Sequence, residues 1–534
     1  MHPSTTDSII RRFRRLQVAI LKGLCLFAVL LTASAAEHPT PAPVVNLGSQ
    51  LQLFFDDYLI DQMSGVRLQL NHPQSAGIAI MFDKPWEGNV SWPQSVFKDG
   101  DIYRMYYIAR SAPDYFRQSG LKPGEVVIPA HPDFMCYAES KDGITWVKPS
   151  LGLVEFNGSK DNNIIADNKK ERLGLIFLDT NPAAPASERY KAVSSTGIGK
   201  NWPANLKQEP QSMILWASSD GLHWKKWTDA PLFRSNLPNV FDGQTVLFWS
   251  SEEQQYVYYF RFMSQDIRTV ARATSKDLLH WSEVEPLAFG DARMEHLYTN
   301  SATPYFRAPQ LTLGFPKRYV PLRKRHDDER IPGISEAAFM ITRDGHNWKL
   351  FGEPFIPPGR DDRNWIHRTT ATSVGIIPTA DDEISLYVER NYTAPSNRIE
   401  RFVIRTDGFT SINADSKGGE FVTKPLSFTG DNLVLNYATS ASGSIQVEVQ
   451  DADGRPLPGF ELEKSIPLWG DEINGVVRWE RPDKTWTDPL NLSGLAQKPI
   501  RLRFVMRNAD IYSLCFRPAA QAVRQADQTT NPKP

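Results

Sequence analysis

Cysteine is nearly absent from this sequence. Three cysteines occur among 534 residues, and only Cys136 and Cys515 lie beyond the N-terminal segment. They allow at most one bridge, which excludes a disulfide-built scaffold, and two free buried thiols are the favoured interpretation. No His/Cys cluster has zinc-ligand spacing and no glycine-rich phosphate loop occurs. We therefore predict no cofactor and no metal, with a structural calcium ion left open.

An excess of charge of either sign is also lacking. The formal net charge is −1, and removal of the basic N-terminal segment makes the chain slightly more acidic. Such a chain has no electrostatic attraction for nucleic acid or for an anionic membrane surface. We expect neither as a partner, and we expect a monomer.

A long apolar run occurs once, at the N-terminus. Arg11, Arg12, Arg14 and Arg15 precede an apolar stretch over residues 16–31, and Ala33-Ser34-Ala35 follows it. Basic residues, a short apolar run and small residues are typical of a secretory signal peptide. We predict cleavage after residue 35 and a secreted or periplasmic protein. An uncleaved membrane anchor is the alternative, although Lys22 interrupts a run that is short for a span.

A turn motif occurs four times. Its copies start at Ser140, Ser218, Ser275 and Thr342, each with an aspartate two residues later and a tryptophan four residues after that aspartate. A degenerate fifth copy, Thr406-Asp407-Gly408, lacks the tryptophan. Aspartate followed by glycine is turn chemistry, and tryptophan supplies a plate that packs between sheets. The motifs predict repeated four-stranded sheets, with the tryptophans largely buried, and they build the fold rather than the site.

The remaining sequence divides into two all-β units. Short runs of β-branched and aromatic residues separated by turn residues, with little helical periodicity, favour strands throughout. We predict a mobile leader over 36–50, a five-bladed β-propeller over 51–413, a C-terminal β-sandwich over 420–517 and a disordered tail over 518–534. The expected blades are 90–150, 172–228, 239–285, 296–352 and 365–412, with 51–72 completing or bracing the ring. Period-two alternation at 445–450 and 500–507 supports the sandwich.

A propeller brings distant residues to one place. In each blade, the start of the innermost strand and the connection between the second and third strands lie on the same face of the propeller. Long insertions at 111–133, 196–211 and 322–335 occur in such connections. We expect these segments to surround a central pocket; insertions that only decorate the surface are the alternative. Two carboxylates there fit glycoside cleavage, one protonating the leaving oxygen while the other attacks or activates water. We predict Asp242 and Glu295 as this catalytic pair, Glu295 as the acid.

Further polar and aromatic residues at the blade entrances suit sugar binding. The predicted substrate-binding residues are Glu87, Trp92, Gln244, His296, Tyr298, Asn300, Glu336, Arg363, Trp365, His367 and Arg368. Each carboxylate also has a structural interpretation. Asp242, before a glycine, is equally suited to a turn, and Glu295 with His296 to a solvated loop.

The turn motifs resemble those of the five-bladed propeller glycosidases of families 32, 43, 62 and 68. The segment 51–60 and the C-terminal unit are similar to secreted bacterial members of this group, and the resemblance covers about residues 50–517. It implies three pocket carboxylates, one on each of the first three blades. The Asn-Asp-Pro-Asn, Arg-Asp-Pro and Glu-Cys signatures of these enzymes are missing here, so none of the three roles maps onto a residue. The expected function is glycoside hydrolysis of a poly- or oligosaccharide, and a non-catalytic glycan-binding propeller is the alternative.

Overall fold

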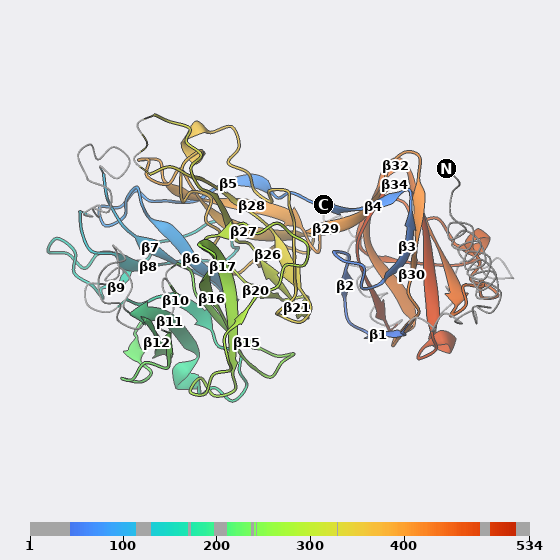
Figure 1. The fold of residues 1–534 in the computed structure, drawn as a ribbon, viewed down its shortest axis with the longest axis horizontal. Helices are drawn as coiled ribbons and strands as arrows, with labels where there is room; N and C mark the ends of the chain where they lie inside the picture. Colours follow the sequence, from blue (N-terminus) through green and yellow to red (C-terminus); the bar gives the residue numbers. More distant parts are fainter. Residues whose placement is uncertain are drawn as a thin grey trace, which may run out of the picture.

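The computed structural model describes residues 43–113, 130–168, 172–196, 211–235, 240–241, 243–327, 329, 331–480 and 492–518. These residues form two all-β lobes (Figure 1), and no α-helix occurs among them. Four single-turn 3₁₀ helices are present: η1 (Ala186–Glu188), η2 (Asp362–Asn364), η3 (Leu462–Lys464) and η4 (Ser493–Leu495). None of the helices in this part of the chain is long and apolar enough to span a bilayer.

The first lobe contains five sheets that follow one another along the chain, which gives a propeller-like arrangement. The first sheet consists of β6 (Trp92–Asp99), β7 (Ile102–Ala109), β8 (Phe134–Ser140) and β9 (Ile164–Asp167). The second consists of β10 (Leu175–Leu178), β11 (Tyr190–Thr196), β12 (Gln211–Ser218) and β13 (Lys225–Lys226), and β14 (Phe233–Ser235) also pairs with β12. The third is β15 (Val246–Ser250), β16 (Gln255–Ser264), β17 (Ile267–Ser275), β18 (Glu285–Pro286). The fourth is β20 (Thr303–Tyr305), β21 (Ala308–Gly314), β24 (Met340–Thr342), β25 (Trp348–Leu350). A small sheet of β19 (His296–Leu297), β22 (Lys317–Val320) and β23 (Ile334–Ala337) extends the fourth.

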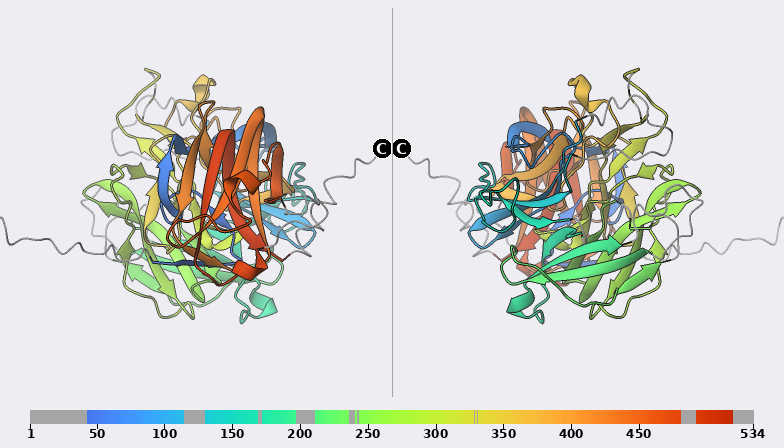
Figure 2. Two further views of the ribbon diagram at one scale, coloured as in Figure 1. Left: turned by 90° about the vertical axis from the view of Figure 1, so that its right-hand side faces the viewer. Right: turned by 90° about the vertical axis from the view of Figure 1, so that its left-hand side faces the viewer.

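The fifth sheet joins the two ends of the lobe. Its first three strands, β26 (Ile377–Ala380), β27 (Glu383–Arg390) and β28 (Arg398–Arg405), come from the C-terminal side, and its outer strand is β5 (Gln74–Met81). This strand was not predicted, because the sequence-based division placed all of the fifth repeat at 365–412. A strand from the other end of the lobe covers an edge that would otherwise stay unpaired. The right-hand view of Figure 2 shows the sheets of this lobe fanned around a common centre.

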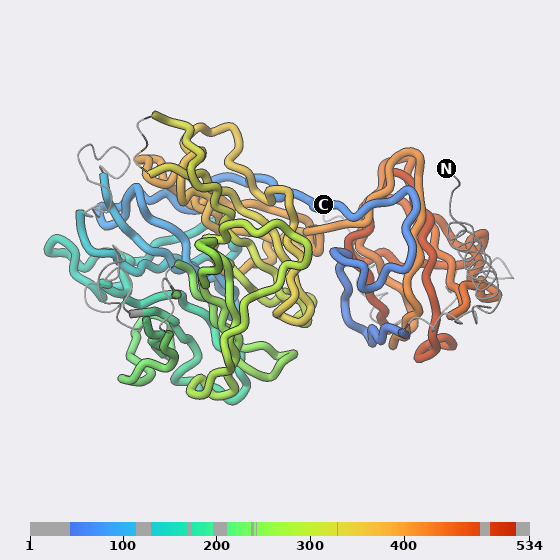
Figure 3. The backbone as a smooth tube through the Cα atoms, viewed as in Figure 1, coloured from blue at the N-terminus to red at the C-terminus, as the bar shows by residue number. Residues whose placement is uncertain are grey.

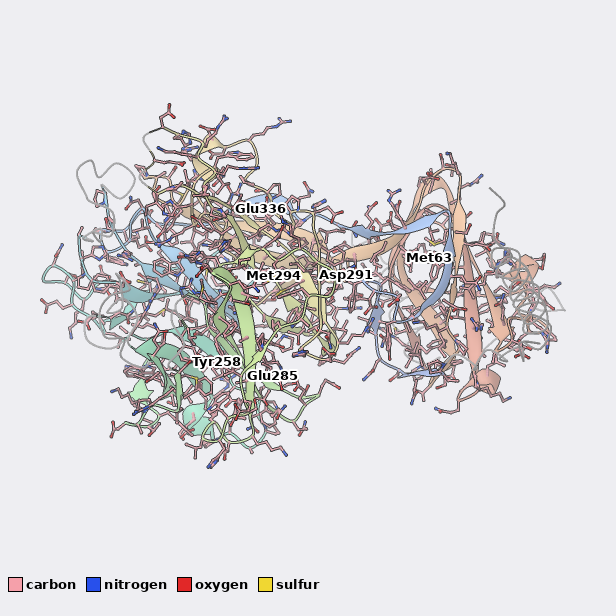
Figure 4. The ribbon with its side chains drawn as sticks, in the orientation of Figure 1. Met63, Tyr258, Glu285, Asp291, Met294 and Glu336 are labelled. Carbon is pink, nitrogen blue, oxygen red and sulfur yellow. The ribbon has the colours of Figure 1, made fainter. Side chains whose placement is uncertain are left out.

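The second lobe is one ten-stranded sheet that takes strands from both ends of the chain. Its strands are β1 (Val45–Gly48), β2 (Gln52–Leu53), β3 (Ile60–Ser64), β4 (Val66–Leu70), β29 (Thr410–Ala414), β30 (Gly419–Thr423), β31 (Leu426–Phe428), β32 (Asn432–Asp451), β33 (Asp471–Val476) and β34 (Ile500–Arg517). The segment expected to brace the ring therefore pairs mainly with C-terminal strands, β3 with β30 and β4 with β29. Figure 3 shows the chain crossing between the lobes twice, once after β4 and once before β29. In Figure 4, Met63 marks this lobe and Glu336 marks the first.

The period-two pattern of the C-terminal sequence matches the observed burial. Ile445, Val447, Leu502 and Phe504 are fully buried in one apolar cluster that also holds Phe421. Alternation of this kind puts every second side chain on the core face.

The lobes are held together by an apolar cluster and a buried carboxylate. Leu53 and Cys515 of the second lobe pack with apolar residues of the fourth and fifth sheets. The carboxylate is Asp407, from the degenerate fifth turn motif, which accepts hydrogen bonds from residues of both lobes. Its partners are Tyr305 Oη, Arg307 Nε (3.0 Å), Asn436 Nδ2 (3.3 Å) and Ser513 Oγ (2.8 Å). Cys136 and Cys515 are both free and buried, as expected.

The four turn motifs adopt one hydrogen-bonding scheme. In the first, Ser140 Oγ accepts from the Gly143 amide at 2.8 Å, and Asp142 Oδ1 accepts from the Ile144 and Thr145 amides, both at 2.8 Å. The other three repeat it. Backbone bonds to the carboxylate lower the pKa of Asp142 to about 2.

Tyrosines of neighbouring sheets bond to these turns. Tyr106 of the first sheet donates to the carbonyl of Gly221 in the second (3.2 Å), and Tyr259 of the third donates to that of Gly345 in the fourth (2.8 Å). Tyr387 of the fifth donates to the carbonyl of Gly143 in the first. The turns therefore join successive sheets, including the last to the first.

The tryptophans of the motifs differ in burial. Trp348 is 3% exposed, as predicted, and packs edge-on against Tyr259 with ring centroids 5.6 Å apart. Trp146, Trp224 and Trp281 are partly buried, each with only the smaller part of its surface exposed, so full burial is reached by Trp348 alone among these four. Trp146, for example, stands at the rim of its cluster with an edge-on contact to Tyr387.

Candidate functional site

The first strands of all five sheets begin around one cavity of about 240 Å³. The lining includes residues that lie at these strand starts or up to six positions before them: Trp92, Pro93 and Gln94; Gly174 and Leu175; Gly243, Gln244 and Thr245; Tyr298 and Thr299; Ala371 and Thr372. Antiparallel strands alternate in direction, so the turn motifs, which link third to fourth strands, lie at the opposite ends of the sheets. The meeting of these segments at one cavity follows from the repeated sheets of antiparallel strands that the sequence predicted.

The charged residues of the cavity are mostly cationic. Arg110, Arg172, Lys317 and Arg368 line it, against the single carboxylate of Asp133 among the described lining residues. Arg110 Nε lies 3.4 Å from Asp133 Oδ1, so this carboxylate is already ion-paired. The cavity therefore has a positive excess in a chain whose overall charge is close to zero.

Tyr298 stands at the centre of the cationic wall. Four cationic groups lie within 6 Å of its ring centroid, namely Arg261 (5.2 Å), Arg268 (5.3 Å), Lys317 (5.6 Å) and Arg368 (5.9 Å). Such contacts between cations and an aromatic ring are attractive, but the cations repel one another. The wall consequently concentrates positive charge beside the cavity.

Lys317 is buried and paired electrostatically with a buried acid. Its Nζ donates a hydrogen bond to the Arg368 carbonyl at 2.6 Å. Burial lowers the pKa of Lys317 to about 8, with Glu389 opposing the shift and Arg368 adding to it. Burial raises the pKa of Glu389 to about 8, with Lys317 and Arg390 opposing the shift. Burial thus disfavours the charged form of each group, while their mutual attraction favours both charged forms.

A hydrogen-bonded network fixes the strand starts on one side of the cavity. Gln244 Oε1 accepts from the Ser301 amide (2.6 Å) and from Ser301 Oγ (2.9 Å), while Asn300 Nδ2 donates to the Gln244 carbonyl (3.3 Å). Ser301 Oγ also lies 2.8 Å from Thr372 Oγ1. The network ties the third, fourth and fifth sheets together. Gln244 therefore both lines the cavity and positions its wall.

The structure places four of the predicted substrate-binding residues in the cavity lining: Trp92, Gln244, Tyr298 and Arg368. Asp242 lies outside the described residues, next to Gly243, which lines the cavity.

Two predicted carboxylates lie elsewhere. Glu295 and Glu336 both pair with Arg318, at 2.5 Å and 3.1 Å, and neither is among the lining residues. Glu295 is therefore held by Arg318 and does not line the cavity, where a general acid would be needed. In Figure 4, Glu336 and Met294, the neighbour of Glu295, lie in the first lobe.

The other predicted binding residues are not among the lining residues, and each has a structural partner. Glu87 is buried, accepts from Tyr107 Oη (2.6 Å) and pairs with Lys148. His296 packs edge-on against Tyr319, and burial followed by the charge of Arg268 lowers its pKa. Asn300 is buried in the network described above. The remaining three are Arg363, paired with Asp361 at 2.9 Å; Trp365, which donates to the Gly359 carbonyl at 2.8 Å; and His367, which is buried near Tyr392.

Sequence reasoning missed Arg110, Asp133, Arg172 and Lys317. Three of these flank the long connections that were predicted to surround the pocket: Arg110 and Asp133 stand at the two ends of the first, and Lys317 opens the strand before the third. Charged residues at the two strand ends that flank an insertion were therefore the signal for the cavity lining, rather than residues within the insertion. Among the described residues, no three His, Cys, Asp or Glu side chains are close enough to hold a metal ion.

Comparison with known proteins gives structural neighbours only. No family model matches the chain, and no curated protein matches it. The structural neighbours are glycoside hydrolases and related proteins. Three examples are a fructofuranosidase from Schwanniomyces occidentalis (10% identity, 82% of this chain and 96% of that chain, TM-score 0.38), a β-1,2-mannobiose phosphorylase from Listeria innocua (12%, 60% and 92%, 0.39) and an N-acetylgalactosamine deacetylase from F. plautii (12%, 68% and 96%, 0.36). These names denote three different reactions, so they assign no reaction to this chain.

Proposed function

We propose that this protein is an exported glycoside hydrolase. Its five successive sheets are the blades of a propeller, and the second lobe is a sandwich, built from both ends of the chain, that braces the ring. The saccharide binds in the central cavity. The observation that carries the proposal is the convergence of all five first strands on one cavity with aromatic and hydrogen-bonding walls. Aromatic faces beside a few polar groups are the usual composition of a small-molecule site. A volume of about 240 Å³ suits one sugar residue rather than a long stretch of chain.

Hydrolysis needs two carboxyl groups across the glycosidic bond. Asp133 lines the cavity, and Asp242 adjoins the lining residue Gly243. We therefore propose Asp133, which lies 3.4 Å from Arg110 Nε, and Asp242 as the two carboxyl groups. Glu295 is replaced in the acid role because it pairs with Arg318 outside the lining.

The test compares three amide variants on a panel of polysaccharides and aryl glycosides. Asp133→Asn and Asp242→Asn keep the side-chain shape and remove acid-base capacity, so each should lower turnover by roughly 10² to 10⁴. Glu295→Gln should keep wild-type turnover and serves as the matched control. Full activity of Asp242→Asn, or loss of activity only in Glu295→Gln, would overturn the assignment.

The second candidate is a non-catalytic glycan-binding protein. It is favoured by the observation that the one carboxylate of the described lining is already neutralised by Arg110. Binding of a glycan by the wild type without turnover, unchanged in both aspartate variants, would establish this candidate instead.

A further inference from the structure

The central cavity offers donors in excess over acceptors. Lys and Arg side chains carry hydrogen-bond donors and no acceptor, and four of them line the cavity. Among the described residues of the lining, the one carboxylate is that of Asp133, and it is paired with Arg110. A neutral sugar hydroxyl both donates and accepts, so it would leave part of this donor set unused. An oxyanion, which only accepts, matches the set better.

The positive wall extends behind the lining. Arg261 and Arg268 are not among the lining residues, but they lie as close to the ring of Tyr298 as Lys317 and Arg368 do and add to their charge. Their potential acts through a partly buried region, where electrostatic interactions are stronger than in water. Burial raises the pKa of Glu389, the buried acid near Lys317, and so weakens the compensation of this charge by its carboxylate.

We propose that the cavity receives an acidic saccharide, a sugar residue carrying a carboxylate or a sulfate ester, with its anionic group held by Lys317 and Arg368 beside Tyr298. This inference rests on the proposed function of the cavity as a saccharide site. Arginine forks bind carboxylate and sulfate oxygens in pairs. The ring of the sugar would lie toward Trp92, whose indole already has the guanidinium of Arg172 at 5.8 Å.

Free inorganic phosphate satisfies the same donors less completely. A lone ion would fill only part of a 240 Å³ cavity and would leave the space beside the aromatic side chains of Trp92 and Tyr392 unfilled. A sugar that carries the anion uses both the donors and the aromatic faces.

The experiment measures binding and turnover of the full exported chain on matched pairs of polysaccharide fragments. Uronic-acid oligosaccharides are compared with their carboxyl-reduced counterparts, and sulfated oligosaccharides with their desulfated counterparts, with inorganic phosphate alone as a further arm. We expect one acidic fragment to bind at least tenfold more tightly than its neutral counterpart. The pair that shows the preference identifies the anion as carboxylate or sulfate.

Three variants test the assigned residues. Lys317→Met and Arg368→Gln should each lower affinity for the acidic fragment roughly ten- to a hundredfold while changing affinity for the neutral counterpart less than threefold. Arg172→Gln changes an exposed side chain at the rim, so it stays informative if the buried variants fail to fold, and we expect a loss of about three- to tenfold. Arg455→Gln, in an exposed hairpin of the second lobe, is the matched control and should bind as the wild type does.

The outcomes separate this inference from the proposed function. Equal or tighter binding of neutral fragments with normal turnover would overturn the acidic specificity and leave the glycosidase proposal standing. Binding of inorganic phosphate as tightly as any acidic fragment would also overturn it, because the anion would then not belong to the sugar. Binding of no fragment at all would overturn both proposals.

Discussion

Replacement of Asp407 by asparagine should weaken the junction between the lobes. The carboxylate is fully buried and accepts hydrogen bonds from Tyr305 and Arg307 of the first lobe and from Asn436 and Ser513 of the second. An amide keeps one acceptor oxygen and turns the other into a donor that faces existing donors. The charge that compensates Arg307 is lost as well.

The cost follows from these contacts. Breaking a buried ion pair by removing one partner costs about 3–5 kcal/mol, but the Arg307 side chain is 24% exposed, so solvent recovers part of this. We expect Asp407→Asn to lower the free energy of unfolding by about 2–4 kcal/mol.

Urea unfolding followed by tryptophan fluorescence measures this change. Asp453→Asn, in an exposed hairpin of the second lobe, is the control and should stay within about 0.5 kcal/mol of the wild type. If Asp407→Asn also unfolds within that margin, the buried carboxylate does not hold the lobes together and the reasoning fails.

Three further predictions concern the repeats and the cavity. Trp348→Ala should lower the free energy of unfolding by about 3–5 kcal/mol, and Trp146→Ala, at a half-buried site, by clearly less; equal losses in denaturant titrations would contradict the difference in burial. Affinity for an acidic saccharide should fall as pH rises through about 8, because the coupled pair of Lys317 and Glu389 then loses a proton and the cavity wall becomes less positive; binding isotherms between pH 6 and 9.5 check this, and an unchanged affinity would refute it. Gly174→Ala should lower both the melting temperature and saccharide affinity, because an added Cβ would lie 2.0 Å from the Val193 carbonyl oxygen in the cavity wall; calorimetry that finds both quantities unchanged would contradict this contact.

Much of the fold was encoded locally. The turn at Ser140 closes through hydrogen bonds within a few residues, so its motif predicts the turn wherever it occurs. Alternation at Ile445 and Val447 likewise predicts a core face, because a strand alternates its side chains whatever its partners are. The convergence of strand starts followed from the repeats and the antiparallel order, and it correctly placed Trp92 and Tyr298 at the cavity.

Tertiary structure decided the rest. The pairing of β5 with β28 joins residues more than three hundred positions apart in sequence, and no local pattern specifies such a partner. Which charged residues line the cavity depended on the side of the strand to which each side chain points. A shift of one residue along a strand moves the side chain to the opposite face. Glu295 consequently pairs with Arg318 outside the cavity lining, whereas Lys317, the residue next to Arg318, lines the cavity. The sequence by itself determined the repeated sheets and their common centre, and only the packing of those sheets decided which charges reach it.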